Sequence, residues 1–80
     1  MRRSQKIAEL EHIAQSFGID VRYEKMGMIP GGLCRLGDKQ VLFINKSLSE
    51  QSKLELLVNE LKNFDIDSLF LLPEIRELLQ

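Results

Sequence analysis

Residues Leu54–Phe64, LELLVNELKNF, give the strongest structural signal in this chain. Large apolar side chains recur there every three or four residues, which is the spacing of one buried face of an α-helix. The members of this stripe are Leu54, Leu57, Val58, Leu61 and Phe64. The stretch therefore predicts an amphipathic helix over about residues 49–63, capped at its N-terminus by Ser47 or Ser49.

A second apolar stripe predicts a helix near the start of the chain. Ser4 can cap this helix, and Gly18 can end it by adopting a left-handed conformation. The apolar positions are Ile7, Leu10, Ile13, Ala14 and Phe17. His12 lies on the opposite side of the helix at 100° per residue, so we expect this histidine to face solvent.

Three short segments between these helices have the character of β-strands. Val21–Glu24 alternates apolar and polar residues, and Leu33–Leu36 follows the glycine-rich stretch GMIPGG. Gly37-Asp38 suits a tight hairpin into Val41–Ile44. These segments predict a three-stranded antiparallel meander.

The strand Val41–Ile44 is apolar at every position, so its side chains should be covered on both faces of the sheet. We expect part of the apolar C-terminal segment to cover the second face. In that segment, Asp67 is a candidate cap for a turn of helix over Ser68–Leu72, and Pro73 suits the first turn of a last helix. The predicted fold class is α+β, in the order α-β-β-β-α-α, with the meander packed against helices in a single domain of residues 1–80.

Cysteine content and apolar runs restrict where the chain can act. Cys34 is the only cysteine, so no intramolecular disulfide can form, and a reducing cytoplasm is the expected location. Glu9 and Glu11 interrupt the apolar run that a secretory signal needs. The longest later apolar run, Leu69–Leu72, is far shorter than the roughly 20 residues of a membrane span. We therefore expect no membrane association.

The charge pattern argues against a nucleic-acid partner. Residues 1–40 carry 7 Lys/Arg and 5 Asp/Glu, residues 41–80 carry 4 and 7, and the whole chain has a formal net charge of −1. Arg2, Arg3 and Lys6 form the only basic cluster. A nucleic-acid binder usually has a larger basic surface, so this class of function is not expected.

The segment Asn59–Asn63, NELKN, has the spacing of a zinc-peptidase helix. Asn59 and Asn63 are four residues apart and share one helix face, and Glu60 lies beside them. In the H-E-x-x-H motif, histidines at these two positions bind zinc and the glutamate is the general base. A polar face opposite an apolar stripe is also what any amphipathic helix has, so both interpretations stay open.

The order of features around this segment resembles the N-terminal part of ImmA/IrrE-type zincin-like metallopeptidases. The resemblance covers residues 7–64. It includes the sequence Gly18-Ile19-Asp20-Val21, a glycine-bearing hairpin, and the strand end Ile44-Asn45 before the helix with Glu60. In addition, the run Leu69–Pro73 is similar to a stretch that follows the metal helix in that family, although it comes earlier here.

The resemblance implies a shortened relative that has lost peptidase activity. Asn59 and Asn63 stand where the family has zinc-binding histidines, Glu60 stands where it has the catalytic glutamate, and the further acidic ligand has no match. Because an amide oxygen is a poor zinc ligand, we expect no metal and no cofactor. The alternative is a ligand-binding or hydrolytic enzyme site centred on Glu60, assisted by Cys34 or Tyr23. We expect Cys34 itself to be buried, as strand cysteines often are.

The apolar C-terminal segment suggests an interaction surface. A chain of this length builds only a small core, and apolar residues that the core does not use form patches that typically mark interfaces. The interface candidates are Leu69, Phe70, Leu71 and Leu72. The partner expected on this basis is a second copy in a homodimer, or another protein.

Overall fold

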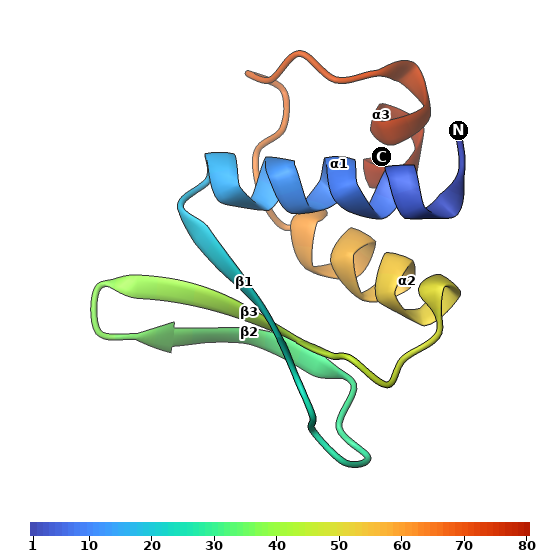
Figure 1. The fold of residues 1–80 in the computed structure, drawn as a ribbon. Coiled ribbons are helices and arrows are strands. Elements are labelled where there is room, and N and C mark those ends of the chain that lie inside the picture. The colour runs from blue at the N-terminus through green and yellow to red at the C-terminus, as the bar shows by residue number, and fades with distance from the viewer.

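The computed structural model describes residues 1–80 and has the order α1, β1, β2, β3, α2, α3. The helices are α1 (Arg3–Ser16), α2 (Glu50–Leu61) and α3 (Pro73–Leu79), and the strands are β1 (Ile19–Glu24), β2 (Gly31–Leu36) and β3 (Lys39–Asn45). The α+β class and the predicted order are confirmed. Figure 1 shows the helices gathered together and the sheet extending away from them.

The sheet has the strand order β1-β3-β2, so the predicted antiparallel meander is wrong. β3 lies in the centre, parallel to β1 and antiparallel to β2. This order gives β3 hydrogen-bonding partners along both of its edges. The hairpin at Gly37-Asp38 is confirmed, with Leu36 opposite Lys39. Residues 25–30 carry the chain from β1 past the end of β3 to β2.

The helices cover one face of this sheet. α1 packs on β1, and α2 packs on α1, β2 and β3. Leu42 and Ile44 of β3 join the main core together with Leu10 and Leu57 of the two long helices, all four of them fully buried. Phe17 and Phe64 extend this core, with ring centroids 5.1 Å apart.

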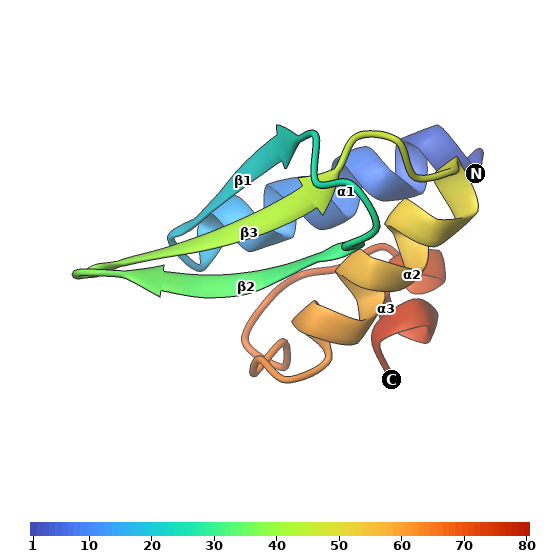
Figure 2. The same cartoon turned by 90° about the horizontal axis from the view of Figure 1, so that it is seen from below.

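The C-terminal segment does not cover the second face of the sheet, contrary to expectation. α3 contacts only α1 and α2 and touches no strand. Residues alternate along a strand, so Val41 and Phe43 point away from the helices. Val41 is buried but lies outside the main core cluster, and Phe43 is half-buried. In Figure 2 the β2–β3 hairpin projects beyond the helices.

The helix boundaries correct two further predictions, the Ser4 cap and a helix over residues 68–72, and they show which serine caps α2. α1 begins at Arg3 rather than after a Ser4 cap, and the Gln5 side chain accepts a hydrogen bond from the Arg2 amide. Ser49, not Ser47, caps α2 by accepting from the Ser52 amide. Residues 68–72 form no helix, whereas the last helix does begin at Pro73.

Candidate functional site

The peptidase-like segment lies at the C-terminal end of α2. Asn59 and Asn63 are exposed, and Glu60 is half-buried. α2 ends at Leu61, so Asn63 lies in the turn beyond the helix. Its side-chain amide donates to the carbonyl oxygen of Asn59 at 3.3 Å. Asn63 therefore helps to close the helix end, where backbone carbonyls lack partners within the helix.

The residues around this segment do not assemble a set of metal ligands. No three side chains of the types His, Cys, Asp or Glu come together anywhere in the structure in a way that could hold an ion. Glu60, His12 and Cys34 therefore do not form a cluster that could bind a metal ion. The two asparagines offer only neutral amides, which are weak ligands for zinc.

An apolar groove runs between α2 and α3 and includes one of the predicted site residues. The groove has a volume of about 330 Å³ and is lined by Gln51, Leu54, Glu55, Val58, Asn59 and Leu78. On its rim, Gln51 donates to the Glu55 carboxylate at 2.9 Å, which holds that carboxylate in place. Glu60 and Asn63 do not line this α2–α3 groove. Of the three residues at the peptidase-like positions, only Asn59 therefore contributes to the concave surface near this segment.

A second hollow, of about 440 Å³, lies where α1 meets β1 and the β2–β3 hairpin. Ile19 is the only apolar residue in its lining, and Asp20 is the only acidic one. The Asp20 carboxylate forms an ion pair with Arg22 at 2.9 Å. Lys39 is the other charged residue of the lining, and it forms no ion pair with Asp20.

Tyr23 is held by both long helices. Its hydroxyl donates to the carboxylate of Glu11 on α1, and the Lys53 ammonium of α2 lies 5.5 Å from its ring centroid. Burial raises the pKa of Tyr23 well above 10, and the hydrogen bond and negative charge of Glu11 raise it further. A tyrosine that keeps its proton and is bonded to Glu11 is suited to joining β1 to the helices rather than to assisting Glu60.

The structure places the histidine and the cysteine on the surface. His12 is exposed, as predicted. Cys34 is also exposed, so the expectation that it is buried is wrong. The reason is its position: β2 is an edge strand, and Cys34 lies opposite Val41 on the face that no helix covers.

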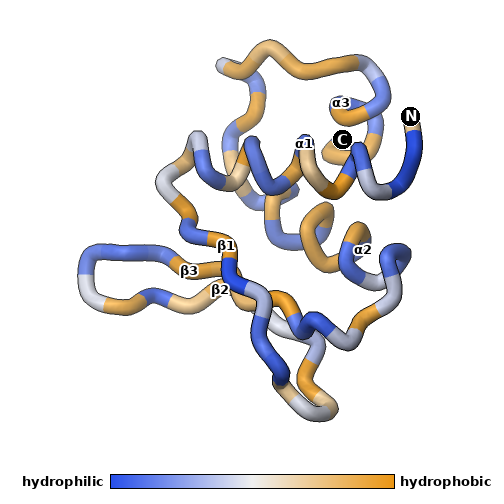
Figure 3. Tube along the Cα trace, viewed as in Figure 1, coloured by the Kyte–Doolittle hydropathy of each residue, from blue (hydrophilic) through white to orange (hydrophobic).

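The four interface candidates divide into two anchored and two exposed residues. Leu69 and Leu71 pack against the core. Phe70 is 96% exposed and Leu72 is 43% exposed. Arg76 of α3 donates to the Leu69 carbonyl at 3.2 Å, which fixes the segment further. Figure 3 shows this apolar stretch at one end of the molecule, before α3.

The loop 25–30 forms a second apolar projection, which the sequence patterns do not predict. Met28 is fully exposed and Ile29 is 60% exposed. Both belong to GMIPGG, a stretch whose composition predicts only a break between strands. The sequence does contain a signal for this exposed projection, because two large apolar residues lie next to each other in a segment rich in turn-forming residues.

None of the three helices is long and apolar enough to cross a membrane. Comparison with known proteins finds no significant match, whether among family models, curated proteins or solved structures. The fold and the surface therefore define the chain as a small α+β protein with two exposed apolar projections and one apolar groove. The likeness to ImmA/IrrE-type peptidases stays a prediction from the sequence.

Proposed function

We propose that this chain is a non-catalytic protein-interaction module, derived from a zincin-like domain, that self-associates through the segment Leu69–Leu72. The observation that carries the proposal is the exposure of Phe70 between two anchored leucines. A reducing, cytoplasmic setting is part of the proposal, because it keeps the exposed thiol of Cys34 reduced.

The segment Leu69–Leu72 leaves nearly the whole Phe70 side chain in water. A phenylalanine side chain presents about 150–250 Å² of surface, and its burial is favourable by roughly 1.5–3 kcal/mol. Leu69, Leu71 and the bond from Arg76 already fix the backbone on both sides of Phe70. A partner would therefore gain this burial without ordering the loop first, which is the advantage of a preorganised contact.

The non-catalytic part of the proposal rests on the residues of α2. Zinc sites are built from Cys, His, Asp and Glu side chains, and two of the family's ligand positions here hold asparagines. Glu60 lines neither hollow of the structure. No observation favours the alternative of an enzyme site centred on Glu60 over the interaction surface.

The experiment that tests this function replaces Phe70 by glutamate. We expect the wild-type protein to form a dimer at micromolar concentration and Phe70→Glu to weaken it by at least about thirty-fold, since central aromatic contacts typically contribute 2 kcal/mol or more. Sedimentation velocity distinguishes the dimer from the monomer. Leu36→Glu is the matched control, because Leu36 is 53% exposed in the β2–β3 hairpin, away from this segment.

An unchanged dimer in Phe70→Glu would remove the segment Leu69–Leu72 from consideration. A dimer that dissociates equally in both variants would mean that added negative charge, and not the loss of Phe70, disrupts the association.

A further inference from the structure

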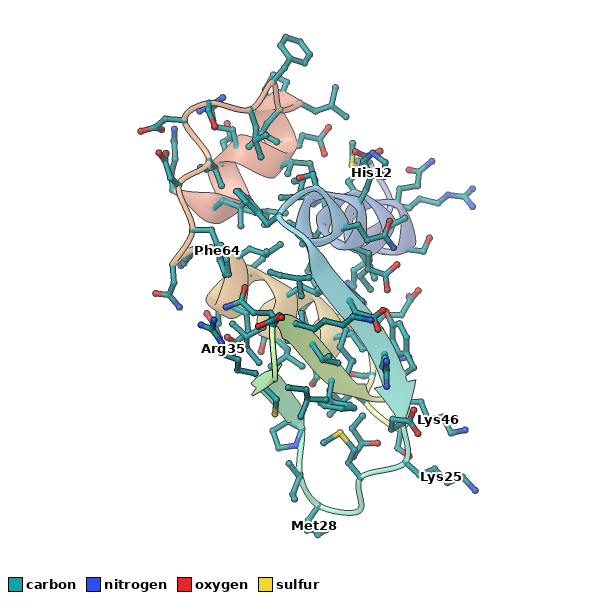
Figure 4. The ribbon with its side chains drawn as sticks, turned by 90° about the vertical axis from the view of Figure 1, so that its left-hand side faces the viewer. His12, Lys25, Met28, Arg35, Lys46 and Phe64 are labelled. Atoms are coloured by element: carbon teal, nitrogen blue, oxygen red, sulfur yellow. The ribbon has the colours of Figure 1, made fainter.

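The loop 25–30 presents its apolar residues at the tip of a basic projection. Met28 has no neighbour that covers it, and Ile29 is largely exposed. Figure 4 shows Met28 at the end of the loop, with Lys25 and Lys46 extending outward beside it. Lys46 is tied to the base of the loop, because its amide donates to the carbonyl of Glu24 at 3.0 Å. We call the residues Lys25–Pro30 together with Lys46 the loop tip.

The loop tip is rigidly held by a buried residue. Asn45, at the end of β3, is 3% exposed and is the only buried polar side chain. Its amide nitrogen donates to the carbonyls of Gly27 and Ile29, and its backbone amide donates to Pro30. The Ile29 amide closes the turn onto the Met26 carbonyl. A turn fixed in this way holds the backbone around Met28 in one conformation, which lowers the entropic cost of binding.

We propose that the loop tip binds the α2–α3 groove of a second copy of this chain. The groove is the concave apolar surface of the molecule, with Leu54, Val58 and Leu78 in its lining. A cavity of about 150 Å³ accepts a benzene-sized group, so a groove of about 330 Å³ has room for Met28 and Ile29 together. This contact does not use Phe70 and goes beyond the proposed self-association through Leu69–Leu72.

Charge complementarity selects a second copy as the occupant. Residues 17–49, which include the sheet and the loop tip, carry five Lys/Arg and three Asp/Glu, a net charge of +2. Residues 50–80, which include the groove, carry three Lys/Arg and seven Asp/Glu, a net charge of −4. Glu55 on the groove rim is the acidic partner for the lysines of the loop tip. Complementary surfaces of this kind speed up and orient association.

A lipid surface is the less favourable occupant. Lys25 and Lys46 are accompanied by the carboxylate of Glu24, and lipid-binding clusters usually contain four or more basic residues. The tip and the groove are different patches, so their contact is head-to-tail. It closes into a dimer only when both contacts form at once, and otherwise continues along a chain of copies.

The test uses the full chain with Phe70→Glu, which removes the other proposed interface. Sedimentation equilibrium at low ionic strength, up to millimolar concentration, measures the remaining association. Lys25→Glu/Lys46→Glu and, separately, Glu55→Lys should each weaken it by about ten-fold or more, because each places like charges at the contact. Lys39→Glu, at the far end of β3, is the control and should leave it unchanged.

Mixing the two charge-reversed chains in equal amounts should restore the association and give species that contain both chains, because the reversed tip then meets the reversed groove. Three results would overturn the proposal: a monomeric Phe70→Glu parent, association that neither reversal changes, or a mixture that stays monomeric. Binding of the parent to anionic vesicles, lost on reversal of the lysines while self-association persists, would assign the loop tip to lipid instead.

Discussion

The side-chain amide of Asn45 holds both backbone carbonyls that flank Met28, at 3.0 Å to Gly27 and 2.9 Å to Ile29. The amide oxygen of Asn45 accepts from the Ser47 backbone at 3.0 Å, so the buried side chain uses its donors and its acceptor. The most buried polar group of the protein thus supports its most exposed apolar one. This pairing connects the central strand to the proposed contact surface.

Replacing Asn45 by aspartate should destabilise the protein at neutral pH. A carboxylate would face two carbonyl oxygens without a proton to donate, and leaving buried polar groups unpaired costs about 1–3 kcal/mol, and more for a charged group. Urea unfolding should show a decrease of at least about 2 kcal/mol in the free energy of unfolding. Asn59→Asp, at an exposed position, is the control. Equal stability of the two variants would show that the Asn45 bonds contribute little.

Gly31→Ala should destabilise far more than Gly18→Ala. At Gly31, φ is +134°, and an added Cβ would lie 2.1 Å from the carbonyl oxygen of Phe43 and 3.1 Å from a methyl group of Leu56. At Gly18, φ is +79°, but the Cβ would meet nothing within 4 Å. We expect about 1 kcal/mol for the backbone strain at Gly18 and at least about twice that at Gly31. Thermal unfolding of both variants checks this, and similar melting temperatures would contradict the close approach of β2 to β3.

Leu57→Asp should unfold the domain. Leu57 is fully buried in the centre of the α2 stripe. Aspartate at this position would lose the apolar contacts of leucine, and its unpaired charge would also lose its hydration. The loss should exceed about 4 kcal/mol, a large part of the stability of a small domain. Asn63→Asp, in the exposed turn after α2, loses only the 3.3 Å bond to the Asn59 carbonyl and should lower the stability by no more than about 1 kcal/mol. Circular dichroism in urea distinguishes the two, and comparable effects would mean that the buried face of α2 is wrongly assigned.

Tyr23 should make the protein sensitive to alkali. In the unfolded chain tyrosine loses its proton near pH 10, whereas burial and Glu11 raise the pKa of Tyr23 in the folded state. Above pH 10 the unfolded chain therefore binds fewer protons than the folded one, so stability falls as the pH rises. Tyr23→Phe should remove this part of the decline, as followed by melting temperatures from pH 9 to 11.5. The same alkaline slope in both proteins would show that Tyr23 titrates normally.

Local patterns in the sequence were sufficient to predict most elements of this fold. The stripes of α1 and α2, the hairpin at Gly37 and the start of α3 at Pro73 depend on side-chain periodicity and turn chemistry, which act over a few residues. The strand order depends on which strands meet in space. The apolar run Val41–Ile44 indicated a strand covered on both faces, but periodicity does not identify its neighbours.

The candidate site was less predictable, because exposure depends on tertiary packing. Cys34 was expected to be buried, but it lies on an edge strand and on an uncovered face. Phe70 and Leu71 are adjacent and both apolar, and only the packing of Leu71 against the core separates their roles. The loop tip was missed because the anchoring residue, Asn45, is 17 positions away from Met28 in the sequence.

Native mass spectrometry of the wild-type protein, purified without chelator and compared with Phe70→Glu, is the most direct test of the central claim. One spectrum reports subunit number and bound metal together. We predict a wild-type dimer without a stoichiometric metal mass, and a monomer for Phe70→Glu at the same micromolar concentration. A wild-type monomer, or a mass excess of one zinc per chain, would contradict the account and return attention to Glu60.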